Sequence, residues 1–139
     1  MNLNFLEKKW FLYLFYFLAT AFFVFQHLKG ISWDFMVYSM NGRYLFGDDF
    51  FFEWLRPPLA PFLIGIFGFL GDNVAEFFYI IFVAFLHFFS CRLFAKKFYL
   101  NENYFYILSL SFFVLINGLN VGTELLTLSL IQLFLAFLE

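Results

Sequence analysis

The carboxylates that could do chemistry gather in one stretch of the sequence, residues 31–71. This stretch holds Asp34, the adjacent pair Asp48 and Asp49, and Glu53, although only 13% of the whole chain is charged. A carboxylate can act as a general base when it lies within reach of the proton that it removes. Paired carboxylates can instead hold a divalent cation through their oxygens. The carboxylates of this stretch could therefore support two kinds of chemistry, proton abstraction or metal binding.

Asp34 is our candidate for the general base. It lies between Trp33 and Phe35, shortly after the first hydrophobic run, and aromatic residues favour the membrane–water interface. A base at that level could serve both a lipid-borne and a water-borne reactant. The alternative is that Asp34 caps a helix that runs toward Tyr44.

The acidic pair has a simpler interpretation than a metal site. Gly47 followed by Asp48 and Asp49 is an ordinary turn sequence, because glycine and aspartate both favour turns. We therefore favour a turn and expect no cofactor, and we keep a metal held by Asp48 and Asp49 as the alternative.

Two arginines and one further acid complete the candidates. The guanidinium of Arg43 or Arg56 presents a planar fork that matches phosphate oxygens, although either could instead contact lipid headgroups. Glu124 follows the third hydrophobic run, and an acid at membrane depth indicates function. The alternative for Glu124 is the first turn of a helix, where acids are favoured.

The composition predicts an integral membrane protein. The 139 residues are 64% hydrophobic and 28% aromatic, with 28 Phe, whereas soluble domains are about 45–50% apolar. The sequence has no basic patch of the kind that would indicate nucleic-acid binding. The single cysteine, Cys91, excludes an intramolecular disulfide.

Hydrophobic runs predict an all-α fold with about four transmembrane helices. Lys8 and Lys9 place the N-terminus in the cytoplasm by the positive-inside rule, and the basic residues 92–97 favour the same side. The long loop 28–76 then lies outside the cell membrane and carries short juxtamembrane helices. Its apolar part, 57–71, is short for a span, so we expect it to lie along the outer surface or to re-enter. The predicted spans are residues 10–26, 77–95, 104–117 and 125–138.

The order of short motifs resembles the N-terminal part of the GT-C membrane glycosyltransferases. It is most similar to the protein mannosyltransferase and aminoarabinose transferase branch, in its archaeal-type members. The motifs are Trp33-Asp34-Phe35, Asn41-Gly42-Arg43-Tyr44-Leu45, Arg56-Pro57-Pro58-Leu59-Ala60-Pro61 and the basic segment from Cys91 to Lys97.

The resemblance implies transfer of a sugar, with inversion, from a polyprenyl-phosphate-linked donor to a protein or glycolipid acceptor on the outer face. In that family the first-loop aspartate, here Asp34, deprotonates the acceptor hydroxyl, and Glu124 matches the acidic position of the second outer loop. Pro57 and Pro58 would shape the start of the surface helix. The assignment of Arg43 or Arg56 to the donor phosphate is our own.

The resemblance also limits what this chain does alone. Phe35 stands where many members have a second acid, which argues against a metal-dependent mechanism. Family members have many more spans, so we expect residues 1–139 to be a single membrane module, the N-terminal portion of a larger enzyme, and inactive alone. The alternative function is a small non-catalytic membrane subunit or a lipid-binding scaffold.

Overall fold

The computed structural model describes residues 8–47, 52–120 and 122–138, and within these ranges the chain is helical, without strands. The all-α prediction is therefore confirmed. The elements are α1 (Lys9–Lys29), α2 (Trp33–Leu45), α3 (Leu59–Ile66), the 3-10 helix η2 (Gly68–Leu70), α4 (Asp72–Lys97), α5 (Glu102–Ser109), α6 (Phe112–Asn117) and α7 (Glu124–Leu138).

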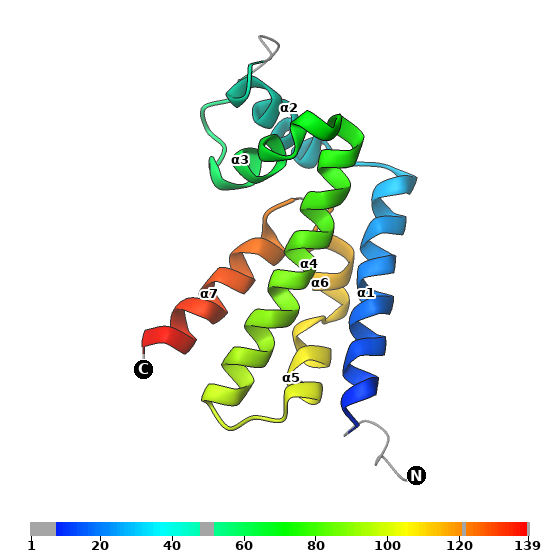
Figure 1. Cartoon of the computed structure of the whole chain (residues 1–139), viewed down its shortest axis with the longest axis vertical. Helices are drawn as coiled ribbons and strands as arrows, with labels where there is room; N and C mark the ends of the chain where they lie inside the picture. The colour runs from blue at the N-terminus through cyan, green and yellow to red at the C-terminus, as the bar shows by residue number, and fades with distance from the viewer. Residues whose placement is uncertain (1–7, 48–51, 121, 139) are drawn as a thin grey trace.

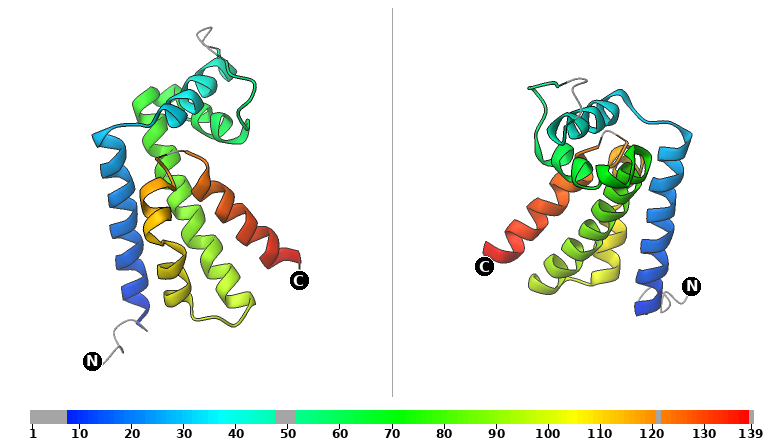
Figure 2. Two further views of the ribbon diagram at one scale, coloured as in Figure 1. Left: turned by 180° about the vertical axis from the view of Figure 1, so that it is seen from behind. Right: turned by 45° about the horizontal axis from the view of Figure 1, so that its top comes forward.

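Helix α4 is the central element of the molecule. It packs against α1, α5 and α7 along its length, and against α2, α3 and η2 near its N-terminal end. Figure 1 shows the short helices α2 and α3 together at that end of the bundle, and both views in Figure 2 agree. We call this group, residues 33–47 and 52–71, the cap. The opposite end, where α1 and α5 begin and α4 ends, we call the basic end.

In the described part of the chain, two helices are long and apolar enough to cross a membrane, α1 with 21 residues and α4 with 26. At about 1.5 Å per residue both reach the ~30 Å of a hydrocarbon core. This suggests membrane association. The two helices also contain the first two spans predicted from the sequence, residues 10–26 and 77–95.

The other two predicted spans are not confirmed. The run 104–117 is not one helix, because α5 ends at Ser109 and Ser111 adopts extended backbone before α6 begins. Neither α5, with eight residues, nor α6, with six, is long enough alone. Helix α7 has 15 residues and reaches only about 22 Å.

The cap is held together by close contact between two backbones. A Cβ atom added to Gly42 in α2 would lie 2.7 Å from the carbonyl oxygen of Pro61 in α3, and one added to Gly65 would lie 2.6 Å from the carbonyl oxygen of Gly42. Only glycine allows α2 and α3 to pack this closely. At the end of η2, Gly71 has a φ of 97°, which side-chain-bearing residues rarely adopt, and α4 starts directly after it.

The interior of the bundle contains a cluster of polar side chains from α4, α5 and α7. The imidazole of His87 lies 3.0 Å from Ser109 Oγ and 3.3 Å from Ser129 Oγ, and Ser90 donates to Gln132 Oε1 at 2.7 Å. Cys91, which is fully buried, lies 3.3 Å from the same Gln132 oxygen. These bonds satisfy polar side chains in an apolar interior and join α4 to α5 and α7.

Candidate functional site in the cap

Helix α2 presents Asp34 in its first turn. The hydroxyl of Ser32 caps the helix, accepting a hydrogen bond from the backbone nitrogen of Phe35 at 3.1 Å, and it also donates to the carbonyl of Asn120. The alternative that Asp34 is the helix cap is therefore wrong. A carboxylate in the first turn is stabilised by the partial positive charge of the helix N-terminus.

Arg56 lies directly against Asp34. One of its Nη atoms is 2.5 Å from an Asp34 carboxylate oxygen, and its Nε is 3.5 Å from Glu53. The guanidinium carbon lies 5.6 Å from the centroid of the Tyr38 ring. Desolvation lowers the pKa of Arg56, but the hydrogen bond and charge of Asp34 outweigh it, so the net pKa is raised. Arg56 is therefore a permanent cation beside the candidate base.

Asn41 fixes the segment that carries Arg56. Its side chain donates to the carbonyl of Glu53 at 3.1 Å and accepts from the nitrogen of Glu53 at 2.9 Å, and Asn41 is 1% exposed. Pro57 and Pro58 follow Arg56 and lead directly into α3. Because proline fixes its own φ near −65°, the two residues limit the directions that the chain can take after Arg56.

Arg43 lies near the end of α2, away from Asp34. It lies nine residues after Asp34 on α2, about 13.5 Å along the axis and half a turn around it. One of its Nη atoms is 3.1 Å from Asp72 and the other 3.9 Å from Glu76. The two candidate arginines therefore do not act on one group together. Of the two, the structure brings only Arg56 to Asp34.

A cavity of about 340 Å³ opens beside Arg43, between α2, α3 and the start of α4. Its polar walls come from Arg43, Asp72 and Ser39, and the Nε of Arg43 is buried without a hydrogen-bond partner in the part of the chain that the structure describes. The remaining wall is formed by small and apolar residues: Gly42, Phe46, Ile64, Gly65, Ile66, Gly68, Phe69 and Ala75.

Glu76 is the residue that sequence reasoning missed. Its side chain is 6% exposed; one carboxylate oxygen accepts from the hydroxyl of Ser39 and the other lies 2.9 Å from Nε2 of His27. These contacts join α1, α2 and α4. One signal was present: His27 ends the first apolar run and Glu76 precedes the second, so antiparallel packing of the two helices brings them together.

Glu124 is the first residue of α7, exposed, and its carboxylate accepts a hydrogen bond from the Thr123 nitrogen at 3.3 Å. The loop before it lies against α2 and α4: Tyr79 donates to the carbonyl of Gly122, and a Cβ on Gly122 would lie 3.0 Å from the Tyr38 ring. Glu124 thus starts a helix near the cap, and no hydrogen bond joins it to Asp34 among the residues described.

The possible metal ligands Asp48 and Asp49 lie outside the described residues. Within residues 8–47, 52–120 and 122–138, no group of three or more His, Cys, Asp or Glu side chains could hold a metal ion.

Comparisons with known proteins find nothing similar: no family model, no curated protein and no solved structure matches the chain. The resemblance to GT-C enzymes therefore remains a prediction from short motifs.

Proposed function

We propose that this chain is the N-terminal module of a glycosyltransferase in the cell membrane, which moves a sugar from a polyprenyl-phosphate-linked donor to a protein or glycolipid hydroxyl. The observation that carries the proposal is the Asp34–Arg56 pair at 2.5 Å. It combines a carboxylate that can accept a proton with a cation that can hold a phosphate. Both groups lie in the cap, at one end of two helices that are long enough to span a membrane.

The reaction is a single displacement with inversion. Asp34 takes the proton of the acceptor hydroxyl while the oxygen of that hydroxyl attacks the anomeric carbon of the donor sugar. The bond from that carbon to the phosphate oxygen breaks, and the polyprenyl phosphate leaves with the electron pair. Arg56 stabilises the negative charge that develops on the leaving phosphate. No cofactor is required.

The ion pair must change when the donor binds. In the structure Arg56 neutralises Asp34, so the carboxylate is held by a cation rather than by an acceptor hydroxyl. A guanidinium has five N–H donors in a fork that suits phosphate. We infer that the donor phosphate takes over part of this fork, which frees a carboxylate oxygen of Asp34 for the acceptor.

The cavity beside Arg43 gives a second position for the phosphate. Arg43 lies about 13.5 Å along α2 from Asp34 and on the opposite side of the helix, so a donor phosphate in this cavity would lie far from the proposed base. Sugar transfer by the variants Arg56→Gln and Arg43→Gln distinguishes the two positions for the phosphate. Our proposal expects Arg56→Gln to reduce sugar transfer more than Arg43→Gln does.

In the membrane, we propose that the cap lies on the outer side and the N-terminus in the cytoplasm. The basic residues at the opposite end, Lys8, Lys9, Arg92, Lys96 and Lys97, support this orientation by the positive-inside rule. The short helix α3, with eight residues, supports a position along the outer surface for the segment 57–71. Accessibility of a cysteine introduced at Asn73 to an impermeant reagent tests the orientation.

The second candidate function is a non-catalytic membrane subunit or scaffold. A specific observation favours it: Asp34, Glu53, Asp72 and Glu76 are all in ion pairs with arginines, as structural carboxylates would be. The deciding experiment measures sugar transfer from a polyprenyl-phosphate donor by native membranes that contain the protein and by membranes that lack it. Equal transfer by the two would favour the scaffold.

A further inference from the structure

Among the described residues, cations far outnumber acids at the basic end. Within residues 8–47, 52–120 and 122–138, this end has one acid, Glu102. The cations there are Lys8, Lys9, Arg92, Lys96 and Lys97.

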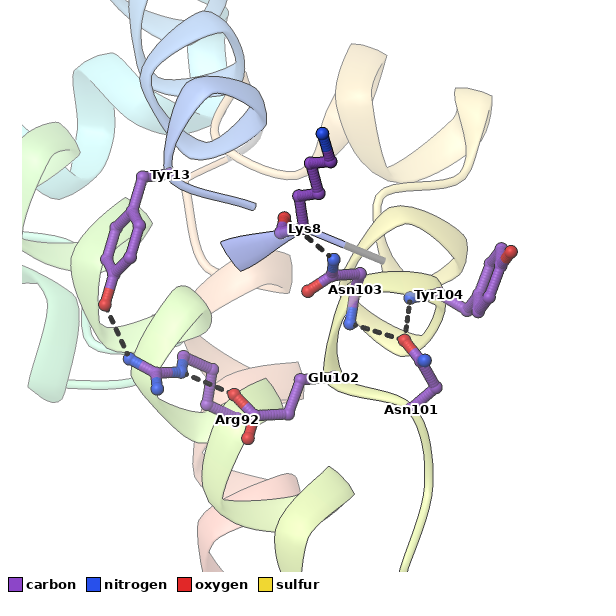
Figure 3. A network of polar contacts seen from close by, with 7 residues as sticks. All are labelled: Lys8, Tyr13, Arg92, Asn101, Glu102, Asn103 and Tyr104. Carbon is purple, nitrogen blue, oxygen red and sulfur yellow. Dashed lines mark hydrogen bonds and ion pairs between the residues drawn. The ribbon is translucent and has the colours of Figure 1, made fainter. Parts of the chain in front are cut away.

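Arg92 is already engaged inside the protein. Its Nε donates to Glu102 at 2.8 Å, and Nη1 donates to the hydroxyl of Tyr13 at 3.4 Å (Figure 3). The guanidinium also lies 5.6 Å from the centroid of Phe88. Arg92 therefore joins α4 to α1 and α5. Lys96 and Lys97, one turn further along α4, form no ion pair with any residue that the structure describes.

These two lysines line a cleft of about 290 Å³ between the end of α4 and the end of α7. The other walls are Leu93, Tyr99, Ala136 and Phe137. Helix α7 diverges from α4 toward its C-terminal end in Figure 1 and in both views of Figure 2. The cleft is thus lined by two lysines together with apolar residues, which matches a ligand with an anionic head and an apolar tail.

Tyr99 is held at the edge of this cleft by the end of α4. It has a φ of 55°, unusual for a residue with a side chain, and the next nitrogen, of Leu100, donates to the carbonyl of Ala95 at 2.8 Å. The side chain is almost fully exposed, at 97%. Its hydroxyl is a hydrogen-bond donor that could reach a bound headgroup, and tyrosine favours the membrane interface.

We propose that this cleft binds one anionic phospholipid, with its phosphate on Lys96 and Lys97 and an acyl chain along Leu93, Ala136 and Phe137. Charge complementarity selects this occupant over a second copy of the chain, because a symmetric contact here would bring the lysines of both copies together. The apolar walls select a lipid over free phosphate. The inference does not depend on the proposed glycosyltransferase activity.

Native mass spectrometry of the detergent-purified chain tests the proposal with phosphatidylglycerol and phosphatidylcholine of identical acyl chains. We expect preferential retention of one phosphatidylglycerol. The double variant Lys96→Gln/Lys97→Gln should bind it about 30-fold more weakly, as expected for two lysines near an anionic surface. Lys96→Arg/Lys97→Arg should retain binding. The matched control is Lys29→Gln, at the cap end of α1, which should bind as the wild type does.

The proposal is overturned by equal retention of the two lipids, by unchanged binding in the double glutamine variant, or by an equal loss of binding in Lys29→Gln. Displacement of the lipid by excess glycerol phosphate would identify a phosphate site without a lipid channel. A dimer that persists without lipid and is lost in the double variant would identify a second copy as the occupant. Far-UV circular dichroism checks that every variant keeps its helices.

Discussion

The two ends of the bundle use charge in opposite ways. At the cap end, arginines and carboxylates from distant parts of the sequence pair with one another, and Glu76 on α4 is nearly buried among three helices. At the basic end, one arginine pairs internally while Lys96 and Lys97 face a cleft without an ion-pair partner among the described residues. Charges that are neutralised inside the protein fix its shape, whereas charges left open are suited to a ligand.

The largest expected effect is the loss of Glu76, the carboxylate that joins α1, α2 and α4 next to the cap. Glu76→Ala leaves His27 Nε2 and the hydroxyl of Ser39 without the carboxylate that each contacts, in a position with little access to water. We expect the free energy of unfolding to fall by about 3 kcal/mol, because removing one partner of a buried pair leaves the others unsatisfied. Denaturant titration in detergent, followed by circular dichroism, measures it.

The matched control for that variant is Asp72→Asn, which removes the other carboxylate on Arg43. The side chain of Asp72 is 46% exposed, so its pair with Arg43 is exposed to solvent. Such pairs contribute about 0–1 kcal/mol. An equal loss of stability in the two variants would contradict the view that burial makes the contacts of Glu76 more stabilising than those of Asp72.

The next effect tests the backbone contact that holds the cap together. Gly65→Ala introduces a Cβ atom 2.6 Å from the carbonyl oxygen of Gly42 and into the ring of Phe46. We expect a loss of about 1–3 kcal/mol in the free energy of unfolding, as for other overpacked sites. Gly68→Ala is the control, since a Cβ there would meet nothing within 4 Å. If both alanines are tolerated equally, α2 and α3 do not pack as described.

The smallest effect is expected at the basic end. Arg92→Gln removes the ion pair with Glu102, in which the two side chains are 39% and 36% exposed. The loss should be below about 1 kcal/mol, because solvent screens the pair. A loss as large as that of Glu76→Ala, measured by the same titration, would remove the contrast between the two ends.

The sequence predicted the helical fold because long apolar runs leave few alternatives. It also identified the two long helices, and Ser32 before Trp33 is a cap signal that could have been used. The break at Ser111 was missed, since the apolar pattern continues through it. Asp34 and Arg56 were each proposed as site residues, but their contact could not be predicted, because it depends on how Asn41 folds the intervening segment back.

The central claim is that Asp34 is the general base. The most direct test introduces Asp34→Asn into the protein expressed in the cell and measures sugar transfer by the native membranes. Asparagine keeps the size and hydrogen-bonding capacity of aspartate but removes its basicity. We expect transfer from a polyprenyl-phosphate donor to fall about 10²–10⁴-fold at matched expression, with Asp48→Asn and Asp49→Asn near the wild-type rate. Near-normal transfer by Asp34→Asn, with transfer abolished in Asp48→Asn or Asp49→Asn, would contradict the account.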